Sequence, residues 1–131
     1  MILDILLKPT QLKREIESMR NEQEALRAFA ESKTSVISLA PGHGQGVSRS
    51  LENALIKVAD LDAEIKAKTE ELDASETVLM KLLEKLDDGI YKRILIHKYL
   101  LNENWPIISS SIHVSERQCH YLHDEALQKL S

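Results

Sequence analysis

Two stretches in the first two thirds of the chain repeat apolar residues at helical spacing. In the first, the apolar positions fall on one helical face, interrupted by the polar Gln23; they are Leu12, Ile16, Met19, Leu26 and Ala30. In the second, from about Leu51 to Leu86, every seventh residue is apolar: Val58, Ile65, Leu72, Leu79 and Leu86. The companions expected at the four-residue offset turn polar in the middle; they are Leu55, Asp62, Thr69, Glu76 and Leu83. The pattern predicts two long helices that pack on each other.

The connection between these helices, residues 33–49, is short enough to force an antiparallel, coiled-coil-like hairpin over residues 1–86. It contains Pro41-Gly42-His43-Gly44-Gln45-Gly46 among serines, and a glycine-rich loop before a helix can bind phosphate. A P-loop would follow a strand and end in Gly-Lys-Ser/Thr, and the sequence has neither feature here. We therefore interpret the loop, at about residues 33–50, as a flexible connector.

The first seven residues are apolar except for Asp4 and are followed by Pro9, which is expected to break or start a helix. Running the hairpin backward from its connection brings this segment beside four apolar residues, Val78, Leu79, Leu82 and Leu83. The segment is therefore expected either as a short separate helix at that end of the hairpin or as part of a homodimer interface.

Residues 87–131 show the pattern of a short helix, a tight turn and a second, capped helix. Asn104 can cap the first helix, with Pro106 in its first turn, where a missing N–H costs nothing. Ser115 followed by Gln118 is the capping-box arrangement that starts another helix. The residues expected to face the core are Ile107, Ile108 and Ile112, then Cys119, Leu122, Ala126, Leu127 and Leu130. The pattern predicts a helix-turn-helix, a motif that places its second helix in a DNA groove.

This part of the chain, from about residue 87 to residue 131, resembles region four of bacterial sigma factors and the small phage-encoded sigma-like regulators. The resemblance rests on Arg93-Ile94-Leu95-Ile96-His97-Lys98-Tyr99-Leu100, on Trp105-Pro106-Ile107-Ile108, on Val114-Ser115-Glu116-Arg117-Gln118 and on the ending Ala126-Leu127-Gln128-Lys129-Leu130. The N-terminal part is similar to short phage late-transcription regulators of the RinA/ArpU-like group. The resemblance implies an all-α fold with a sigma-region-four-type helix-turn-helix, and a role in phage or prophage transcription together with host RNA polymerase.

If the second motif helix, at residues 115–130, enters the major groove of double-stranded DNA, its first turns are expected to read the bases. The residues expected to face base edges are Glu116, Arg117, Gln118 and Tyr121, because they precede or interleave the buried stripe. Arg117 suits guanine and Gln118 suits adenine. His120, Lys129 and the backbone N–H groups of the helix N-terminus are expected to hold phosphates.

The charge balance of residues 87–131 is unusual for a DNA-binding domain, with five Lys/Arg against six Asp/Glu. Phosphate neutralisation supplies much of the affinity for DNA. Either a partner such as RNA polymerase contributes the missing affinity, or the module has shifted toward protein contacts.

Other residues that could carry chemistry have structural interpretations. Cys119, the only cysteine, lies on the apolar stripe and is expected in the core. His120 and His123 fall near one face, but no second cysteine completes a zinc set, and we expect no metal or other cofactor. Trp105 and Tyr99 are expected to pack together in the core, whereas Tyr121 is expected to point outward.

Acidic pairs in the same region do not suggest a catalytic site. Asp124 and Glu125 are expected to be solvated, and Asp87 and Asp88 are expected to cap a helix that starts near Gly89. No nucleophile or pocket-forming strand accompanies either pair, so we do not expect an enzyme.

Composition supports an all-helical protein, because only 4% of the residues are aromatic and glycine occurs four times. The net charge is −4, with 29% charged and 43% hydrophobic residues. No apolar run approaches the roughly 20 residues of a membrane span, and the first residues lack the basic leader and cleavage site of a signal peptide. The protein is expected to be cytoplasmic.

The favoured hypothesis is a DNA-binding transcription regulator with domains at residues 1–86 and 87–131. The alternative is an adaptor in which the module binds protein and the hairpin oligomerises. A DNA-packaging adaptor resembling a phage terminase small subunit is a variant of that alternative, since those proteins also join a helix-turn-helix to a coiled coil.

Overall fold

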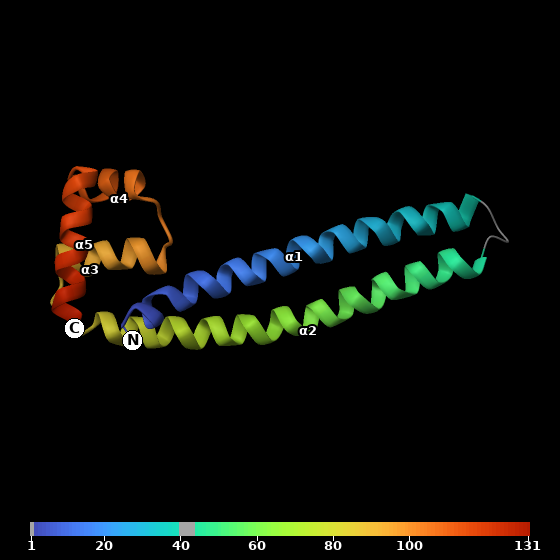
Figure 1. Cartoon of the computed structure of the whole chain (residues 1–131), viewed down its shortest axis with the longest axis horizontal. Coiled ribbons are helices and arrows are strands. Elements are labelled where there is room, and N and C mark those ends of the chain that lie inside the picture. Colours follow the sequence, from blue (N-terminus) through green and yellow to red (C-terminus); the bar gives the residue numbers. More distant parts are fainter. Residues whose placement is uncertain (1, 40–43) are drawn as a thin grey trace. The chain divides into compact units, whose positions relative to one another are not determined.

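The computed structural model describes residues 2–39 and 44–131, including the side chains of residues 2–34 and 49–131. Within these ranges every regular element is a helix: α1 (Ile2–Leu39), α2 (Gly44–Leu83), α3 (Ile90–Leu95), the π-helix η1 (Ile96–Leu100), α4 (Trp105–Ile112) and α5 (Glu116–Leu130) (Figure 1). The predicted all-α class is confirmed. Internal contacts divide the chain into two compact units. The helix-pair unit is Arg14–Glu70, and the bundle unit is Met1–Lys13 together with Glu71–Ser131.

The two long helices extend further than the sequence predicts. α1 has 38 residues and α2 has 40, so residues 33–39 and 44–49 of the expected connector are helical. The remainder of the glycine-rich connector, residues 40–43, lies outside the described residues. Extending an existing helix is far less costly than starting one, which accounts for helix in these serine-rich stretches.

Pro9 does not mark a helix boundary, contrary to the prediction. α1 runs through it without interruption, and the proline side chain is buried. A proline inside a helix removes one backbone hydrogen bond, and the burial of its ring offsets part of that loss. The first residues of the chain are therefore the first turns of α1 and not a separate helix.

In the helix-pair unit, α1 and α2 are antiparallel, because residues later in α1 contact residues earlier in α2. Near the start of this part of α1, a Glu15 oxygen lies 3.0 Å from the Lys68 ammonium. Further along, the buried Gln23 donates through Nε2 to the Val58 carbonyl oxygen at 3.0 Å and to Asp62 Oδ1 at 2.5 Å. Gln23, the polar residue in the otherwise apolar face of α1, is thus satisfied by two hydrogen-bond acceptors on α2.

The predicted face of α1 is confirmed, since Gln23 is buried together with Leu12, Ile16 and Ala30. On α2 the second buried row was assigned incorrectly at two positions. Leu61 is buried, three residues after Val58, whereas Asp62 is exposed and Leu55 is 51% exposed. Two helical turns hold slightly more than seven residues, so the three- and four-residue offsets border the same seam. Leucines occur at both offsets, and apolar character alone could not select between them.

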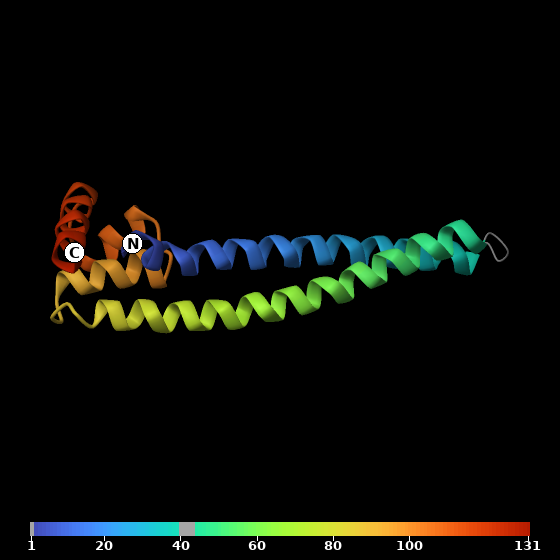
Figure 2. The same cartoon turned by 60° about the horizontal axis from the view of Figure 1, so that its bottom comes forward.

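The bundle unit has one hydrophobic core to which all of its helices contribute. The buried residues of this core are Leu6, Leu79, Leu82, Leu83, Leu86, Ile94, Leu95, Tyr99, Ile108, Cys119, Leu122, Ala126 and Leu130. After α2 the chain reverses direction to enter α3, and α5 packs against both α3 and α4 (Figure 2).

The first turns of α1 belong to this core. Leu6 has no exposed surface. Lys13 Nζ donates to the Leu100 carbonyl oxygen at 3.0 Å, and Thr10 Oγ1 donates to Asn102 Oδ1 at 3.5 Å. The C-terminal helices therefore share a core with residues that the sequence pattern assigned to the hairpin. Among the described helices, none combines the length and the apolar character that a membrane span requires.

Candidate nucleic-acid interface

The N-termini of α4 and α5 are fixed by the two predicted caps. Asn104 Oδ1 accepts a hydrogen bond from the Ile107 N–H at 3.2 Å, with Pro106 in the first turn. Ser115 Oγ accepts from the Gln118 N–H at 3.1 Å. Each cap satisfies one of the backbone donors that a helix leaves free at its start. The caps place the start of α5 at Glu116.

The connection between α4 and α5 is a tight turn centred on His113. This residue has φ 61° and ψ 42°, the left-handed conformation that usually ends a helix at glycine. The Val114 N–H donates to the Ser109 carbonyl oxygen at 3.2 Å, and the Ser109 hydroxyl donates to the Val114 carbonyl oxygen. These bonds close the end of α4 over the turn, so that the direction of α5 is set by backbone geometry.

The apolar faces of α4 and α5 are close to those predicted. Ile108, Cys119 and Ala126 have no exposed surface, and Leu122 and Leu130 are buried with them. Burial raises the pKa of the Cys119 thiol, which suits a core position and not a reactive one. Ile107 is the exception, because it is 48% exposed and does not reach the core. An eight-residue helix turns one narrow face inward, and Ile108 occupies it.

The predicted DNA-contacting residues lie in different places on α5. Glu116, Arg117 and Gln118 are exposed in its first turn. His120 is exposed, but its ring packs on that of Trp105 with the centroids 4.2 Å apart. The last two predicted residues, Tyr121 and Lys129, lie beside Tyr91 of α3.

One side of α5 carries an aromatic cluster centred on His123. Its Nε2 lies 2.6 Å from the Tyr99 hydroxyl, and its Nδ1 lies 3.3 Å from Asp124 Oδ1. With a neutral ring, Tyr99 donates to Nε2 and the Nδ1–H donates to Asp124. Burial lowers the pKa of His123, and the Asp124 carboxylate opposes part of that shift.

Trp105 completes this cluster and packs against the bundle core as predicted, although it is only partly buried. Its ring contacts those of His120 and His123, with the His123 centroid 5.3 Å away. The Lys98 ammonium lies 4.8 Å from the Trp105 ring centroid, a cation–π contact. Two histidine rings thus flank the half-buried tryptophan, and the Tyr99 ring lies against the ring of His123.

The π-helical turn η1 helps to position this cluster. Its wider turn is closed by a hydrogen bond from the Leu101 N–H to the Ile96 carbonyl oxygen at 3.0 Å. It carries Lys98 and Tyr99, and His97 pairs with Glu103 just beyond it. Single π-helical turns are rare in proteins, and those that occur are often found at functional sites. Nothing in the apolar spacing of this segment distinguishes it from an ordinary helix.

The other side of α5 carries a second cluster, centred on Glu125. The Tyr91 hydroxyl donates to Glu125 Oε2, and this hydrogen bond is the main reason why the pKa of Tyr91 is raised. A hydrogen bond with Glu125 likewise raises the pKa of Tyr121. The Lys129 ammonium lies 5.2 Å from the Tyr91 ring centroid. Glu125 was expected to be a solvated residue and is instead half-buried between two tyrosines.

Asp87 and Asp88 do not cap α3, contrary to the prediction. The residue before α3 is Gly89, and no side chain accepts from the first turn. Asp88 instead lies 3.2 Å from the Lys92 ammonium, one turn into the helix. In the part of the chain that the structure describes, no three His, Cys, Asp or Glu side chains are grouped so that they could hold a metal ion.

Comparisons with protein-family models, curated proteins and solved structures found no match to this chain. Its function is therefore inferred from the sequence pattern and from the geometry of α4 and α5.

Proposed function

We propose that the protein is a sequence-specific DNA-binding regulator of transcription, with α4, the His113 turn and α5 acting as a helix-turn-helix. The observation that carries the proposal is the start of α5. A capped helix N-terminus there presents Glu116, Arg117 and Gln118 to solvent, next to a tight turn. Recognition helices read bases in the major groove from this end.

The structure narrows the set of residues that we propose for DNA contact. The proposed base-contacting residues are the exposed Glu116, Arg117 and Gln118. His120 is exposed two residues further along α5, where its ring packs on the ring of Trp105. Tyr121 lies with the carboxylate of Glu125, which would repel phosphates. We therefore omit Tyr121 and Lys129 from the proposed DNA-reading surface.

Electrostatics favour a DNA-binding event that is assisted by a partner. Three of the five cations in residues 87–131 make contacts within the chain: Lys92 with Asp88, Lys98 with the Trp105 ring and Lys129 with the Tyr91 ring. Arg93 and Arg117 are exposed. Even if both arginines neutralised a phosphate, log K would fall with log salt at a slope no steeper than roughly −2. We propose that RNA polymerase supplies the remaining affinity, as the resemblance to sigma region four implies.

The test is a selection of bound sequences from randomised duplex DNA, with and without bacterial RNA polymerase, followed by binding titrations. Arg117→Ala should lose about tenfold to a hundredfold in affinity for the selected sequence and relax the preference at one base pair. Arg20→Ala, an equal change of charge at an exposed position of α1 in the helix-pair unit, should bind like the wild type. If wild type and Arg117→Ala bind selected and random DNA equally in both conditions, the proposal is wrong.

The adaptor alternative is favoured by one observation, the length of the antiparallel α1–α2 pair. Helices of 38 and 40 residues exceed what a small DNA-binding module needs. Apolar side chains are exposed along them, including Leu55 and Ile56 at just over 50%, which suits self-association. A homodimer fits a regulator and a larger ring fits a DNA-packaging adaptor, so light scattering of the full chain separates the two.

A further inference from the structure

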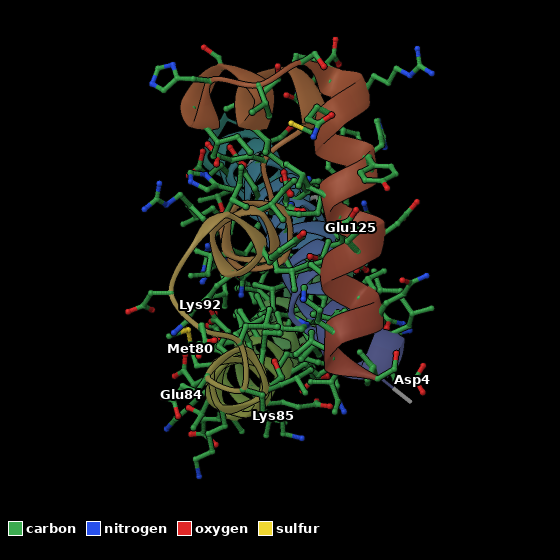
Figure 3. The ribbon with its side chains drawn as sticks, turned by 90° about the vertical axis from the view of Figure 1, so that its left-hand side faces the viewer. Asp4, Met80, Glu84, Lys85, Lys92 and Glu125 are labelled. Atoms are coloured by element: carbon green, nitrogen blue, oxygen red, sulfur yellow. The ribbon has the colours of Figure 1, made fainter. Side chains whose placement is uncertain are left out.

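A hollow lies on the surface of the bundle unit beside the second half of α5. It has a volume of about 520 Å³ and is lined by Tyr91, Tyr121, Asp124, Glu125, Gln128 and Lys129. We call it the tyrosine–carboxylate hollow. Figure 3 shows Glu125 projecting from α5 on this side of the unit.

The hollow combines aromatic faces with negative charge. Tyr121 is 62% exposed, the highest value among the large apolar and aromatic side chains that are exposed in the described residues. Glu125 accepts a hydrogen bond from the Tyr91 hydroxyl and lines the hollow together with Tyr121, and the exposed Asp124 adds a second carboxylate. Aromatic faces attract cations through their quadrupole, and adjacent carboxylates strengthen that attraction.

The chain itself already places a cation here. The Lys129 ammonium sits over the Tyr91 ring, 5.2 Å from its centroid. The exposed face of Tyr121 has the same chemistry and lies next to the same carboxylate. Because the two carboxylates outnumber the single lysine, the hollow keeps a net negative charge.

We propose that the tyrosine–carboxylate hollow receives an arginine side chain from a partner protein. A guanidinium is planar, so it stacks on a tyrosine ring while donating two hydrogen bonds to one carboxylate. An ammonium cannot do both, which favours arginine over lysine. A nucleic acid is a poor occupant because its phosphates would meet Asp124 and Glu125.

This inference does not depend on DNA binding. It assigns a protein-binding role to the second half of α5, whereas the proposed DNA-reading residues occupy the first turn. Arg117→Ala tests the DNA proposal and leaves the hollow unchanged, so failure of one proposal is distinguishable from failure of the other.

The experiment follows the tyrosine ring signals of the full chain by NMR during titration with a peptide probe. The probe is acetyl-Gly-Arg-Gly-Arg-Gly-amide, compared with the same peptide carrying lysines. The arginine peptide should shift the signals of Tyr91 and Tyr121 and bind more tightly than the lysine peptide. Tyr99 is buried at a different site and serves as the internal control.

Three variants sharpen the test. Glu125→Gln, which retains an acceptor for Tyr91, should weaken the arginine peptide about tenfold because a charge-assisted bond is lost. Glu84→Gln makes the same change of charge at an exposed residue after α2, away from Glu125 (Figure 3), and should leave affinity unchanged. Lys129→Ala removes the competing cation from Tyr91 and should tighten binding by a few-fold.

Several results would overturn the proposal. They are the absence of shifts at millimolar peptide, equal shifts on all three tyrosines, and equal weakening by Glu125→Gln and Glu84→Gln. Weaker binding of the peptide to Lys129→Ala would also do so. If duplex DNA shifted the Tyr121 ring signal and bound less tightly to the Lys129→Ala variant, the hollow would instead be assigned to a nucleic-acid surface.

Discussion

Replacing Leu6 by alanine tests whether the start of α1 is part of the bundle core. Leu6 has no exposed surface and belongs to the same cluster as Leu79, Leu83 and Leu95. The substitution removes three carbon atoms, which corresponds to about 2.4 kcal/mol of transfer free energy at about 0.8 kcal/mol for each. The cavity that remains raises the expected loss of unfolding free energy to about 3 kcal/mol, within the range of buried leucine truncations.

Leu7 provides a matched control, since it is the next residue of the same helix and is 49% exposed. Leu7→Ala should cost less than about 1 kcal/mol, because much of its side chain is already in contact with water. The assay is urea unfolding followed by the fluorescence of Trp105, the only tryptophan, which lies in the bundle unit. Equal midpoints for Leu6→Ala and Leu7→Ala would refute the assignment of the N-terminal segment to this core.

Two further predictions concern the histidines near α5. His113 holds a left-handed conformation, so His113→Gly should unfold at the same temperature as the wild type or slightly higher, whereas His113→Val should lose about 1 to 2 kcal/mol; equal melting temperatures for the two variants would contradict the turn. Because burial lowers the pKa of His123 in the folded protein, the unfolded state binds the proton more tightly. The stability that comes from a neutral His123 is therefore present above pH 6.5, the usual histidine value, and is lost as the pH falls below it. His123→Gln keeps an acceptor for Tyr99 and should show less loss of stability between pH 7 and pH 5 than the wild type; parallel pH profiles would rule out His123 as the cause.

The helical class, both caps and most core positions of α4 and α5 follow from local chemistry and could be predicted. Asn104 and Ser115 are acceptors at positions where free backbone donors need them, and that requirement is visible in a few residues of sequence. Cys119 and Leu122 fall on one face at a fixed spacing. Ile107 shows the limit, because a short helix leaves the width of its buried face to be set by neighbours.

Features that depend on long-range partners could not be predicted. Glu125 looks like a solvated carboxylate in the sequence, and only the arrival of Tyr91 from α3 makes it the centre of a cluster. The helix boundary expected at Pro9 was wrong. It rested on the low helix propensity of proline, whereas the burial of the first turns of α1 in the bundle core stabilises the helix through this residue. Similarly, the face of α2 that α1 covers determines whether Leu61 or Leu55 is buried beside Val58, and the sequence of α2 alone does not identify that face.

The positions of the cations connect the charge balance of residues 87–131 to the two proposals. Lysines that could neutralise phosphates instead lie on aromatic rings, Lys98 on Trp105 and Lys129 on Tyr91. The Lys129 contact joins α5 to α3, and the Lys98 contact joins η1 to α4, so both lysines are held within the bundle unit. Under the proposed function, these contacts order the helices around α5 but leave few cations to neutralise phosphates. The DNA-binding proposal therefore requires binding energy from a partner protein, and the proposed arginine site in the tyrosine–carboxylate hollow is one place where a basic partner could supply it.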